Sequence, residues 1–235
     1  TAQTSPVVPA TTPDAPVALA AVSGNALVTL SWAAPEWNGG SAITNYAVQY
    51  SVNGGTSWVT VSRAASTATS QAVTGLTNGT AYVFRVAAVN ARGTGVYTAQ
   101  TSPVVPMTVP GVPRSLAASI GNGQVGLTWA APASSGGSVV TDYVVQWSDN
   151  GGTSWTTVSR AASATPSQLV TGLSNGTAYV FRVAAVNAVG VGVSTAQTSP
   201  VVPATTPDAP VALAAVSGNA LVTLSWAAPE WNGGS

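Results

Sequence analysis

The sequence repeats itself with a period of 97 residues, and this repeat constrains the fold more than any other feature. Trp32 recurs at Trp129 and again at Trp226. Residues 81–106 and 178–203 differ at three of their 26 positions, and the two copies align without an insertion or deletion. A chain built in this way is expected to fold as a series of similar modules, each of which closes its own core.

A longer period of 194 residues lies on top of the first. Residues 1–41 are identical to residues 195–235, so two kinds of unit alternate along the chain. The sequence is therefore interpreted as a window on a longer array. The expected parts are, in order, the last strand of a preceding domain (1–9), two complete domains (11–106 and 109–203) and the first two strands of a following domain (206–235).

Each unit is patterned as β-structure. Short runs rich in β-branched and aromatic residues are separated by turn signals such as Asn53-Gly54 and Asn78-Gly79, and Asn-Gly favours hairpin turns because both residues tolerate positive φ. In the first unit, strands are expected near residues 17–22, 27–33, 43–52, 57–62, 70–74, 80–90 and 96–105. Seven short strands without helical periodicity predict an all-β fold of tandem seven-stranded Greek-key β-sandwiches, immunoglobulin-like in architecture.

The composition excludes whole classes of chemistry. The chain has no Cys, no His and no Lys, and its six Arg are balanced by six acidic residues. It therefore lacks a disulfide, a catalytic thiolate or imidazole, and a lysine for Schiff-base or phosphate chemistry. A neutral chain also lacks the basic patch of a nucleic-acid binder. We expect no enzyme activity, no cofactor and no nucleic-acid partner. Since no apolar run nears the roughly 20 residues of a transmembrane helix, we expect no membrane span in this segment.

Hydroxyl groups rather than charges cover the predicted surface. Thr and Ser contribute 30 and 26 residues, whereas 5% of the chain is charged. Such a surface is well hydrated, but it offers little electrostatic repulsion between copies, and near-zero net charge favours association. Two interpretations stay open: an ordinary hydrated β protein, or a surface that packs beside copies of itself.

Several motifs in register give the chain a family resemblance. Trp32 lies on the second expected strand and Tyr46 on the third, and they are followed by the run 76–90, LTNGTAYVFRVAAVN, which returns almost unchanged at 173–187. This pattern resembles a fibronectin type III domain over the whole chain. The resemblance implies a core Trp, a Tyr near the start of the sixth strand whose hydroxyl caps the preceding loop, and stability without disulfides. It implies no single activity, because the fold serves as a spacer and as a binding scaffold.

The Ala- and Thr-rich, Lys-free style resembles tandem type III repeats of bacterial secreted and cell-surface proteins. It implies an extracellular or cell-surface location. We therefore expect a structural repeat segment of an extracellular fibre or cell-surface stalk, with itself as partner through neighbouring repeats and lateral copies in a filament. The alternative is an adhesin, or a polysaccharide-binding or spacer module of a secreted carbohydrate-active protein.

One group of residues distinguishes the two kinds of unit. Glu36 and Trp37 lie in the loop between the second and third strands, and Arg92 lies between the sixth and seventh, where the other unit has Val189. In this fold the two loops emerge at one pole. We predict that Glu36, Trp37 and Arg92 cluster there, either as a ligand or partner patch or as a contact with the preceding domain. We favour the domain contact, since aromatic residues and Arg commonly anchor contacts.

The remaining candidates have structural interpretations. Trp32, Trp129 and Trp226 are expected in cores, and Trp58 and Trp155 are expected to pack partly rather than to form sugar-stacking platforms. Asn78-Gly79-Thr80 matches a glycosylation pattern but also fits a tight turn, which we favour. Asp142 and Asp149 are too few carboxylates for calcium, so no metal is expected. Residues 206–235 are expected to leave Leu213, Leu221 and Trp226 uncovered.

Overall fold

The structure, a computed structural model, describes residues 9–234, so the strand expected at residues 1–9 lies almost wholly outside the described residues. The described part of the chain is all-β and forms two compact units, each considered by itself below. The strands of the first unit are β1 (Val17–Gly24), β2 (Leu27–Ala33), β3 (Asn45–Ser51), β4 (Val59–Thr60), β5 (Ser70–Thr74), β6 (Val83–Asn90) and β7 (Gly93–Tyr97).

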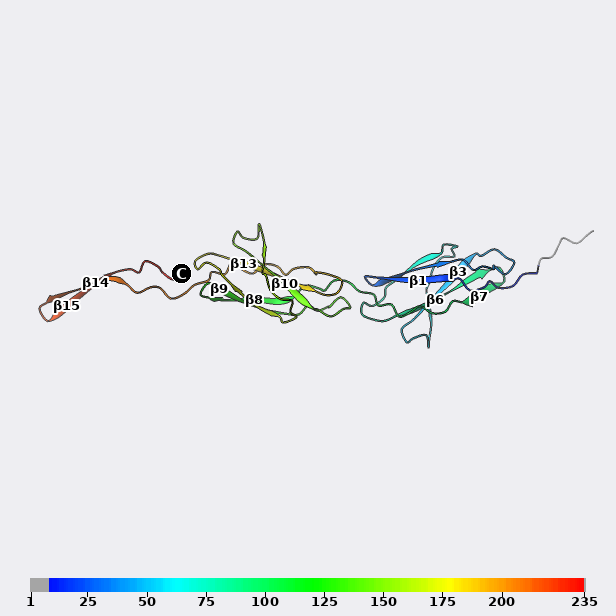
Figure 1. The fold of residues 1–235 in the computed structure, drawn as a ribbon, viewed down its shortest axis with the longest axis horizontal. Helices are drawn as coiled ribbons and strands as arrows, with labels where there is room; N and C mark the ends of the chain where they lie inside the picture. The colour runs from blue at the N-terminus through cyan, green and yellow to red at the C-terminus, as the bar shows by residue number, and fades with distance from the viewer. Residues whose placement is uncertain (1–8, 235) are drawn as a thin grey trace, which may run out of the picture. The chain divides into compact units, whose positions relative to one another are not determined.

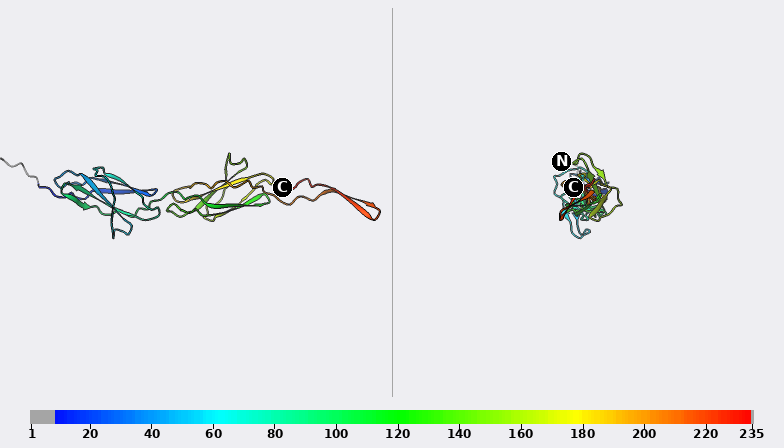
Figure 2. Two further views of the ribbon diagram at one scale, coloured as in Figure 1. Left: turned by 180° about the vertical axis from the view of Figure 1, so that it is seen from behind. Right: turned by 90° about the vertical axis from the view of Figure 1, so that its left-hand side faces the viewer.

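The first unit is a sandwich of two antiparallel sheets. One sheet has the strand order β1-β2-β5 and the other β4-β3-β6-β7 (Figure 1). The chain therefore passes from β2 to β3 by changing sheets, and from β4 to β5 by changing back. Figure 2 shows the ribbon of the same strands from behind. The strand orders confirm the predicted Greek-key sandwich.

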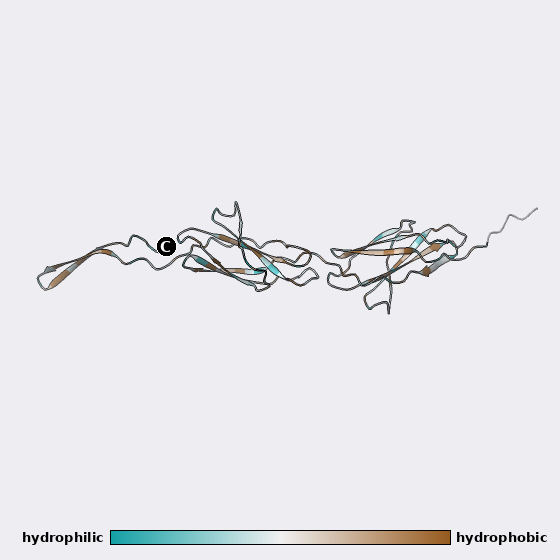
Figure 3. Cartoon of the chain, in the orientation of Figure 1, coloured by the Kyte–Doolittle hydropathy of each residue, from teal (hydrophilic) through white to brown (hydrophobic). Residues whose placement is uncertain are grey.

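The alternation of residues along β2 explains why this segment is a strand. Val28, Leu30 and Trp32 point inward and are 0%, 0% and 6% exposed, whereas Thr29 and Ser31 between them face solvent. A side-chain period of two requires extended backbone to place all three apolar residues on one face. In contrast, β6 is buried along most of its length because it lies between two other strands of its sheet. Figure 3 shows the hydrophobic stretches, in brown, along strands of both units.

Aromatic rings fill the first core. Trp32 meets Tyr46 edge-on, with ring centroids 5.3 Å apart, and Tyr82 stacks near Phe84 at 6.3 Å. Burial raises the pKa of Tyr46 above its ordinary value, while the Trp32 side chain lowers it by a smaller amount. The predicted role of Trp32 as a core residue is confirmed.

Two side chains hold the turn that precedes β6. The Tyr82 hydroxyl accepts a hydrogen bond from the Thr77 backbone N–H at 3.0 Å. The Asn78 Oδ1 accepts from the Ala26 N–H at 2.8 Å, and the Asn78 Nδ2 donates to the Asn25 Oδ1 at 2.9 Å. The Tyr therefore caps the loop as the resemblance implied, and the Asn78 amide holds two turns together.

The second unit repeats this arrangement with β8 (Arg114–Gly121), β9 (Gln124–Ala130), β10 (Asp142–Ser148), β11 (Thr156–Thr157), β12 (Ser167–Thr171) and β13 (Val180–Val186). Its sheets have the orders β12-β9-β8 and β11-β10-β13. Trp129 is 6% exposed and meets Tyr143 edge-on at 5.1 Å, as its counterpart does in the first core. The Tyr179 hydroxyl caps its loop by accepting from the Ser174 N–H at 3.1 Å.

The last segment of each sandwich differs from the regular strand expected at 96–105. In the first unit β7 ends at Tyr97, and the chain then bonds to β6 at Thr98 and Thr101 and to Tyr82, just before β6, at Val104. These contacts advance three residues along the segment for every two along β6. A regular ladder cannot absorb the extra residue, so the segment bulges between contacts. Pro103, which has no N–H to donate, adds to the irregularity.

Threonine hydroxyls replace the missing ladder atoms. Thr98 donates its N–H to the Val86 carbonyl and accepts from the Val86 N–H through its hydroxyl at 3.2 Å. Thr101 does the same with Phe84, and Thr195 and Thr198 repeat both pairs in the second unit. There the segment after β13 forms no named strand, and two isolated bridges, Val186 to Val191 and Tyr179 to Val201, accompany these threonine pairs. The edge is thus paired without being a regular strand.

A hairpin of β14 (Val211–Gly218) and β15 (Leu221–Ala227) follows the second sandwich. Its sequence is that of β1 and β2, and its register has the same irregularity near the start. No second sheet covers it in the described residues. Leu213, Leu221 and Trp226 are 70%, 58% and 60% exposed. The hairpin by itself therefore forms no core, as predicted, and Trp226, the counterpart of Trp32 in an identical sequence, is buried only where further strands cover it.

Candidate functional site

The structure brings the two loops of the predicted pole together through one buried amide. Asn90, which is 4% exposed, donates from its Nδ2 to the Thr11 carbonyl at 2.7 Å and to the Asn38 carbonyl at 2.8 Å. Its Oδ1 accepts from the Arg92 N–H at 2.8 Å. The loop containing Trp37, the loop containing Arg92 and the segment that enters β1 therefore share one anchor.

The three side chains predicted at this pole all face solvent. Trp37 is 51% exposed, Glu36 and Arg92 are exposed, and no ion pair joins Glu36 to Arg92 in the described part of the chain. The Trp37 carbonyl accepts from the Asp14 N–H at 3.1 Å, which fixes the loop but not the indole. The structure thus brings together the loops that carry these residues, but it shows no contact between the Glu36 and Arg92 side chains. The last strand expected of the preceding domain lies almost wholly outside the described residues, so its contact with this pole stays a prediction.

A cation–aromatic cluster, which the sequence interpretation missed, lies on the outer face of the β4-β3-β6-β7 sheet. The guanidinium carbon of Arg85 on β6 lies 4.0 Å from the ring centre of Trp58 and 4.4 Å from that of Tyr97. Its Nε donates to the Gln49 Oε1 at 2.8 Å. The predicted partial packing of Trp58 is confirmed. One signal could have revealed its partner, namely an Arg at an outward position of an otherwise apolar run.

The second unit carries a reduced version of this cluster. Arg182 lies 4.1 Å from the ring centre of Trp155, and its Nε donates to the Gln146 Oε1 at 2.7 Å. Ser194 stands where the first unit has Tyr97, so one ring is missing. The two units thus form a matched pair that differs at this surface by one aromatic side chain.

A second matched pair involves a partly buried arginine in the segment between the fourth and fifth strands of each unit, Arg63 and Arg160. In the second unit Arg160 forms an ion pair with the Asp142 Oδ1 at 2.5 Å and donates to the Tyr143 carbonyl at 2.7 Å. Burial by itself raises the pKa of Asp142. The backbone hydrogen bonds from Ser163 and at Tyr143, together with Arg160, outweigh burial, so the pKa lies below its ordinary value.

The first unit lacks the carboxylate of that pair. Asn45 takes the place of Asp142, and its Oδ1 accepts the same kind of backbone bond, from the Ser66 N–H at 3.1 Å. The Nε and Nη1 of Arg63 are buried and have no hydrogen-bond partner in the structure. A buried donor without a partner loses its hydration and gains nothing in return, which costs about 1–3 kcal/mol. Arg63 is therefore a weak point of the first core.

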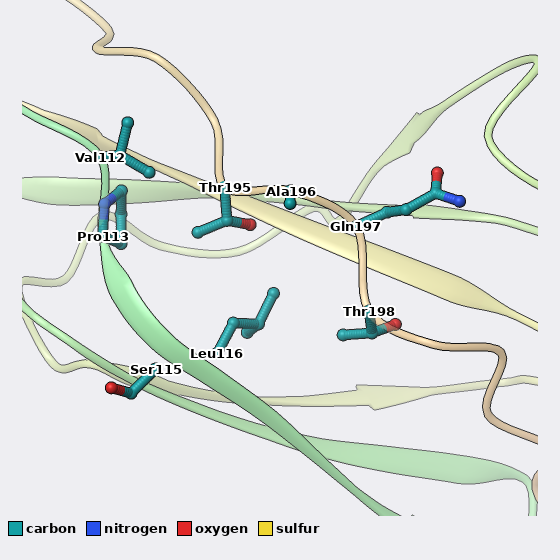
Figure 4. Close-up of a pocket in the computed structure, with 8 residues that line it drawn as sticks. All are labelled: Val112, Pro113, Ser115, Leu116, Thr195, Ala196, Gln197 and Thr198. Carbon is teal, nitrogen blue, oxygen red and sulfur yellow. The ribbon is translucent and has the colours of Figure 1, made fainter.

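Each unit has an open groove between its first strand and its last segment. The groove of the second unit has a volume of about 310 Å³, and that of the first about 390 Å³. The former is lined by Val112, Pro113, Ser115, Leu116, Thr195, Ala196, Gln197 and Thr198, and Figure 4 shows Leu116 between β8 and the 195–198 segment. The register of β8 slips between Arg114 and Ala117, where Ser115 has a φ of 54°. No charged side chain lines either groove.

The arrangement offers binding surfaces rather than reactive groups. Residues 9–234 contain no group of three or more acidic, His or Cys side chains that could hold a metal ion. The same part of the chain contains no helix long and apolar enough to cross a membrane. What the described surface offers instead is aromatic, amide, hydroxyl and guanidinium groups.

The comparison with family models decides the classification. The model described as "Fibronectin type III domain" matches residues 12–104 and 111–201. The chain belongs to the fibronectin type III family. The resemblance stated from the sequence is confirmed for the family and for the tandem arrangement. The matched ranges lie close to the domains expected at 11–106 and 109–203, whose bounds stay a prediction.

Several relatives of this type III chain are muscle proteins by name. Myomesin-2 of Homo sapiens is 34% identical over 179 residues, which is 74% of this chain and 12% of the relative. The M-protein of striated muscle from Gallus gallus is 31% identical over 179 residues, which is again 74% of this chain and 12% of the relative. Cardiac-type myosin-binding protein C of Mus musculus is 29% identical over 182 residues, which is 77% of this chain and 14% of the relative. The chain thus spans a small fraction of each relative's length.

Among solved structures, the chicken CNTN1 FN1–FN3 domains match with a TM-score of 0.46 and 19% identity. The match covers 91% of this chain and 75% of the other.

These relatives correct one prediction and limit others. The extracellular or cell-surface location is wrong, because the relatives are named for striated muscle and for myosin, an intracellular filament protein. The relatives are animal proteins, so a bacterial source stays a prediction. None of their names points to polysaccharide, and that partner has no support.

Proposed function

We propose that this chain is a structural repeat segment of a protein assembly. It acts as a spacer and binds protein partners, and the main partner we propose is another copy of the same array. The observation that carries the proposal is the pair of complete sandwich cores, each sealed around its Trp, with no cluster of reactive groups in the described residues. The relatives are named for muscle and for binding myosin, which supports association with protein rather than with sugar. We propose no catalytic role.

The surface chemistry supports self-association. The formal net charge is zero, so copies do not repel one another at long range. Large apolar side chains are also exposed on the described sandwiches, among them Val96 at 66% and its counterpart Val193 at 67%. They recur with the period of the repeat, so a neighbouring array in register meets each of them in turn.

For the pole, we propose that Glu36, Trp37 and Arg92 contact the preceding module. The exposed indole of Trp37 and the Asn90 anchor beneath its loop support this proposal, since a fixed loop presents its aromatic side chain at little entropic cost. The alternative, a patch for a separate protein partner, uses the same three side chains.

Sedimentation velocity over a wide concentration range tests the proposed function. We expect the weight-average sedimentation coefficient of the 235-residue chain to rise with concentration at low salt. The Val96→Ser/Val193→Ser double variant should shift that rise to higher concentration, and a Thr29→Ser variant at an exposed strand position is the matched control. A coefficient that falls slightly with concentration, as for a monomer, would refute self-association.

A further inference from the structure

The guanidinium of Arg85 is held in a fixed position on the outer face of the first sandwich. It stacks on the rings of Trp58 and Tyr97 at 4.0 and 4.4 Å. Its Nε is fixed by the Gln49 Oε1, and the Gln49 Nε2 in turn donates to the Thr60 hydroxyl at 3.0 Å. The side chain is therefore ordered before any partner arrives, so binding loses little rotamer entropy.

The outer end of this guanidinium is available. Arg carries five N–H donors, and Nε uses one. The Nη1 and Nη2 groups of Arg85 neither donate to a residue of the described chain nor belong to its buried unpartnered atoms, in contrast to Nε and Nη1 of Arg63. Arg85 as a whole is partly exposed, so a partner can reach it beside the Gln49 amide and the two aromatic rings.

The positive charge of Arg85 has no counter-charge in its surroundings. The side chains that surround it are neutral: Gln49, Trp58, Thr60 and Tyr97. Within residues 9–234 the ion pair between Arg160 and Asp142 is the only one. No second cation stands beside Arg85 among these contacts, so the site suits a ligand with a single negative charge better than a phosphate, which carries about two.

We propose that Arg85 is a carboxylate-binding site for an Asp or Glu side chain of a partner protein. The two Nη groups form a planar fork that matches the two oxygens of a carboxylate. The flanking rings offer apolar contact to the methylene groups of that side chain. The proposal rests on the proposed function in one respect, that the partner is a protein.

The second unit provides an internal comparison. Arg182 has the same Gln partner and the same Trp, but Ser194 replaces the second ring. Its guanidinium is held on fewer sides, so it binds the same carboxylate more weakly. The affinity difference between Arg85 and Arg182 is therefore set by one side chain.

Side-chain NMR of the full chain tests the site. The Nε–Hε signals of its six Arg are followed while an acetylated, amidated pentaglutamate peptide is added at constant ionic strength, with the pentaglutamine peptide as control. We expect a saturable shift at Arg85, a weaker one at Arg182, and no saturation at the exposed Arg92. Equal response of all three Arg, or an equal shift with pentaglutamine, would overturn the proposal.

Two reciprocal variants sharpen the test. Tyr97→Ser should lower the affinity at Arg85 to that of Arg182, and Ser194→Tyr should raise Arg182 toward Arg85. The backbone amide spectrum shows whether each variant keeps its fold, and the second variant decides the matter if the first unfolds. No change in either affinity contradicts the role of the ring. If copies associate in sedimentation while Arg85 ignores the peptide, this inference fails and the proposed function stands.

Discussion

At the scale of single residues, the two sandwiches differ most in the partners of one partly buried arginine. Arg160 has Asp142 as counter-ion, whereas Arg63 faces Asn45 at the equivalent position and keeps two buried donors without partners. The sequence shows the exchange of Asn for Asp at a spacing of 97 residues, but not that Arg160, in the segment between β11 and β12, meets Asp142. That contact depends on the path of this segment from one sheet to the other, which no local pattern encodes.

Exchanging Asn and Asp at positions 45 and 142 should stabilise the first sandwich and destabilise the second. Asn45→Asp supplies the missing charge, so we expect the free energy of unfolding of the first sandwich to rise by about 1–2 kcal/mol. Asp142→Asn leaves Arg160 buried without its counter-ion, and we expect a loss of about 2–4 kcal/mol in the second. Urea unfolding of the whole chain, followed by NMR signals of Val48 and Val145, reports each core. A change of the same sign in both variants contradicts this account.

The same carboxylate predicts different acid sensitivity in the two units. The pKa of Asp142 is lower in the folded chain than its ordinary value of 3.8, so folding favours the ionised form. Its contribution is complete above the unfolded pKa and is lost as the pH falls through the folded pKa. We therefore expect the second sandwich to lose stability more steeply than the first below about pH 4. Urea midpoints at a series of pH values test this, and parallel loss in both units would count against it.

At the scale of elements, the regular strands could be predicted and the last segment could not. Alternation in β2 and the Asn-Gly turns place strands within a few residues of their observed bounds. The last strand was predicted near residues 96–105, at an edge and interrupted by Pro103. It is irregular because the Thr98 and Thr101 hydroxyls accept hydrogen bonds in place of backbone carbonyls. Strand propensity and side-chain alternation do not show which threonines bond in this way.

These hydroxyls should be necessary for the edge. Thr98→Val and Thr101→Val keep the shape of the side chain but remove the acceptor for the Val86 and Phe84 N–H groups. We expect each to lower the stability of the first sandwich by about 1 kcal/mol, the usual net contribution of a hydrogen bond. Thr29→Val on the exposed face of β2 is the matched control and should have little effect. Hydrogen exchange at the Val86 and Phe84 amides should quicken selectively in the variants, and unchanged protection would refute the assignment.

At the scale of the whole molecule, the repeat itself predicted most of what matters: tandem sandwiches, separate cores and an uncovered hairpin. The sequence predicted a cluster of Glu36, Trp37 and Arg92, and the structure brings their loops together through Asn90. The contact of these side chains with the preceding module stays a prediction. The Arg85 cluster was missed. Trp58, Arg85 and Tyr97 come from three separate segments, and only the sheet brings them together.

The proposed contact of the pole predicts a change in the solution shape of the array. In the Trp37→Ala/Trp231→Ala variant we expect a different small-angle scattering profile, since both copies of the anchoring indole are removed. Val139→Ala, at a residue that is 75% exposed, is the control and should leave the profile unchanged. Profiles that superpose for all three proteins would remove the contact and leave the patch for a separate partner.

Single-molecule stretching of the 235-residue chain tests the central claim most directly, that two self-contained sandwiches provide mechanical spacing. Each sandwich holds about 90 residues, and extended chain measures about 3.3–3.6 Å per residue, so each should unfold in its own event that releases roughly 300 Å. We predict two separate force peaks, each followed by a nearly equal increase in contour length. One event of double length, or extension without peaks, would contradict the account.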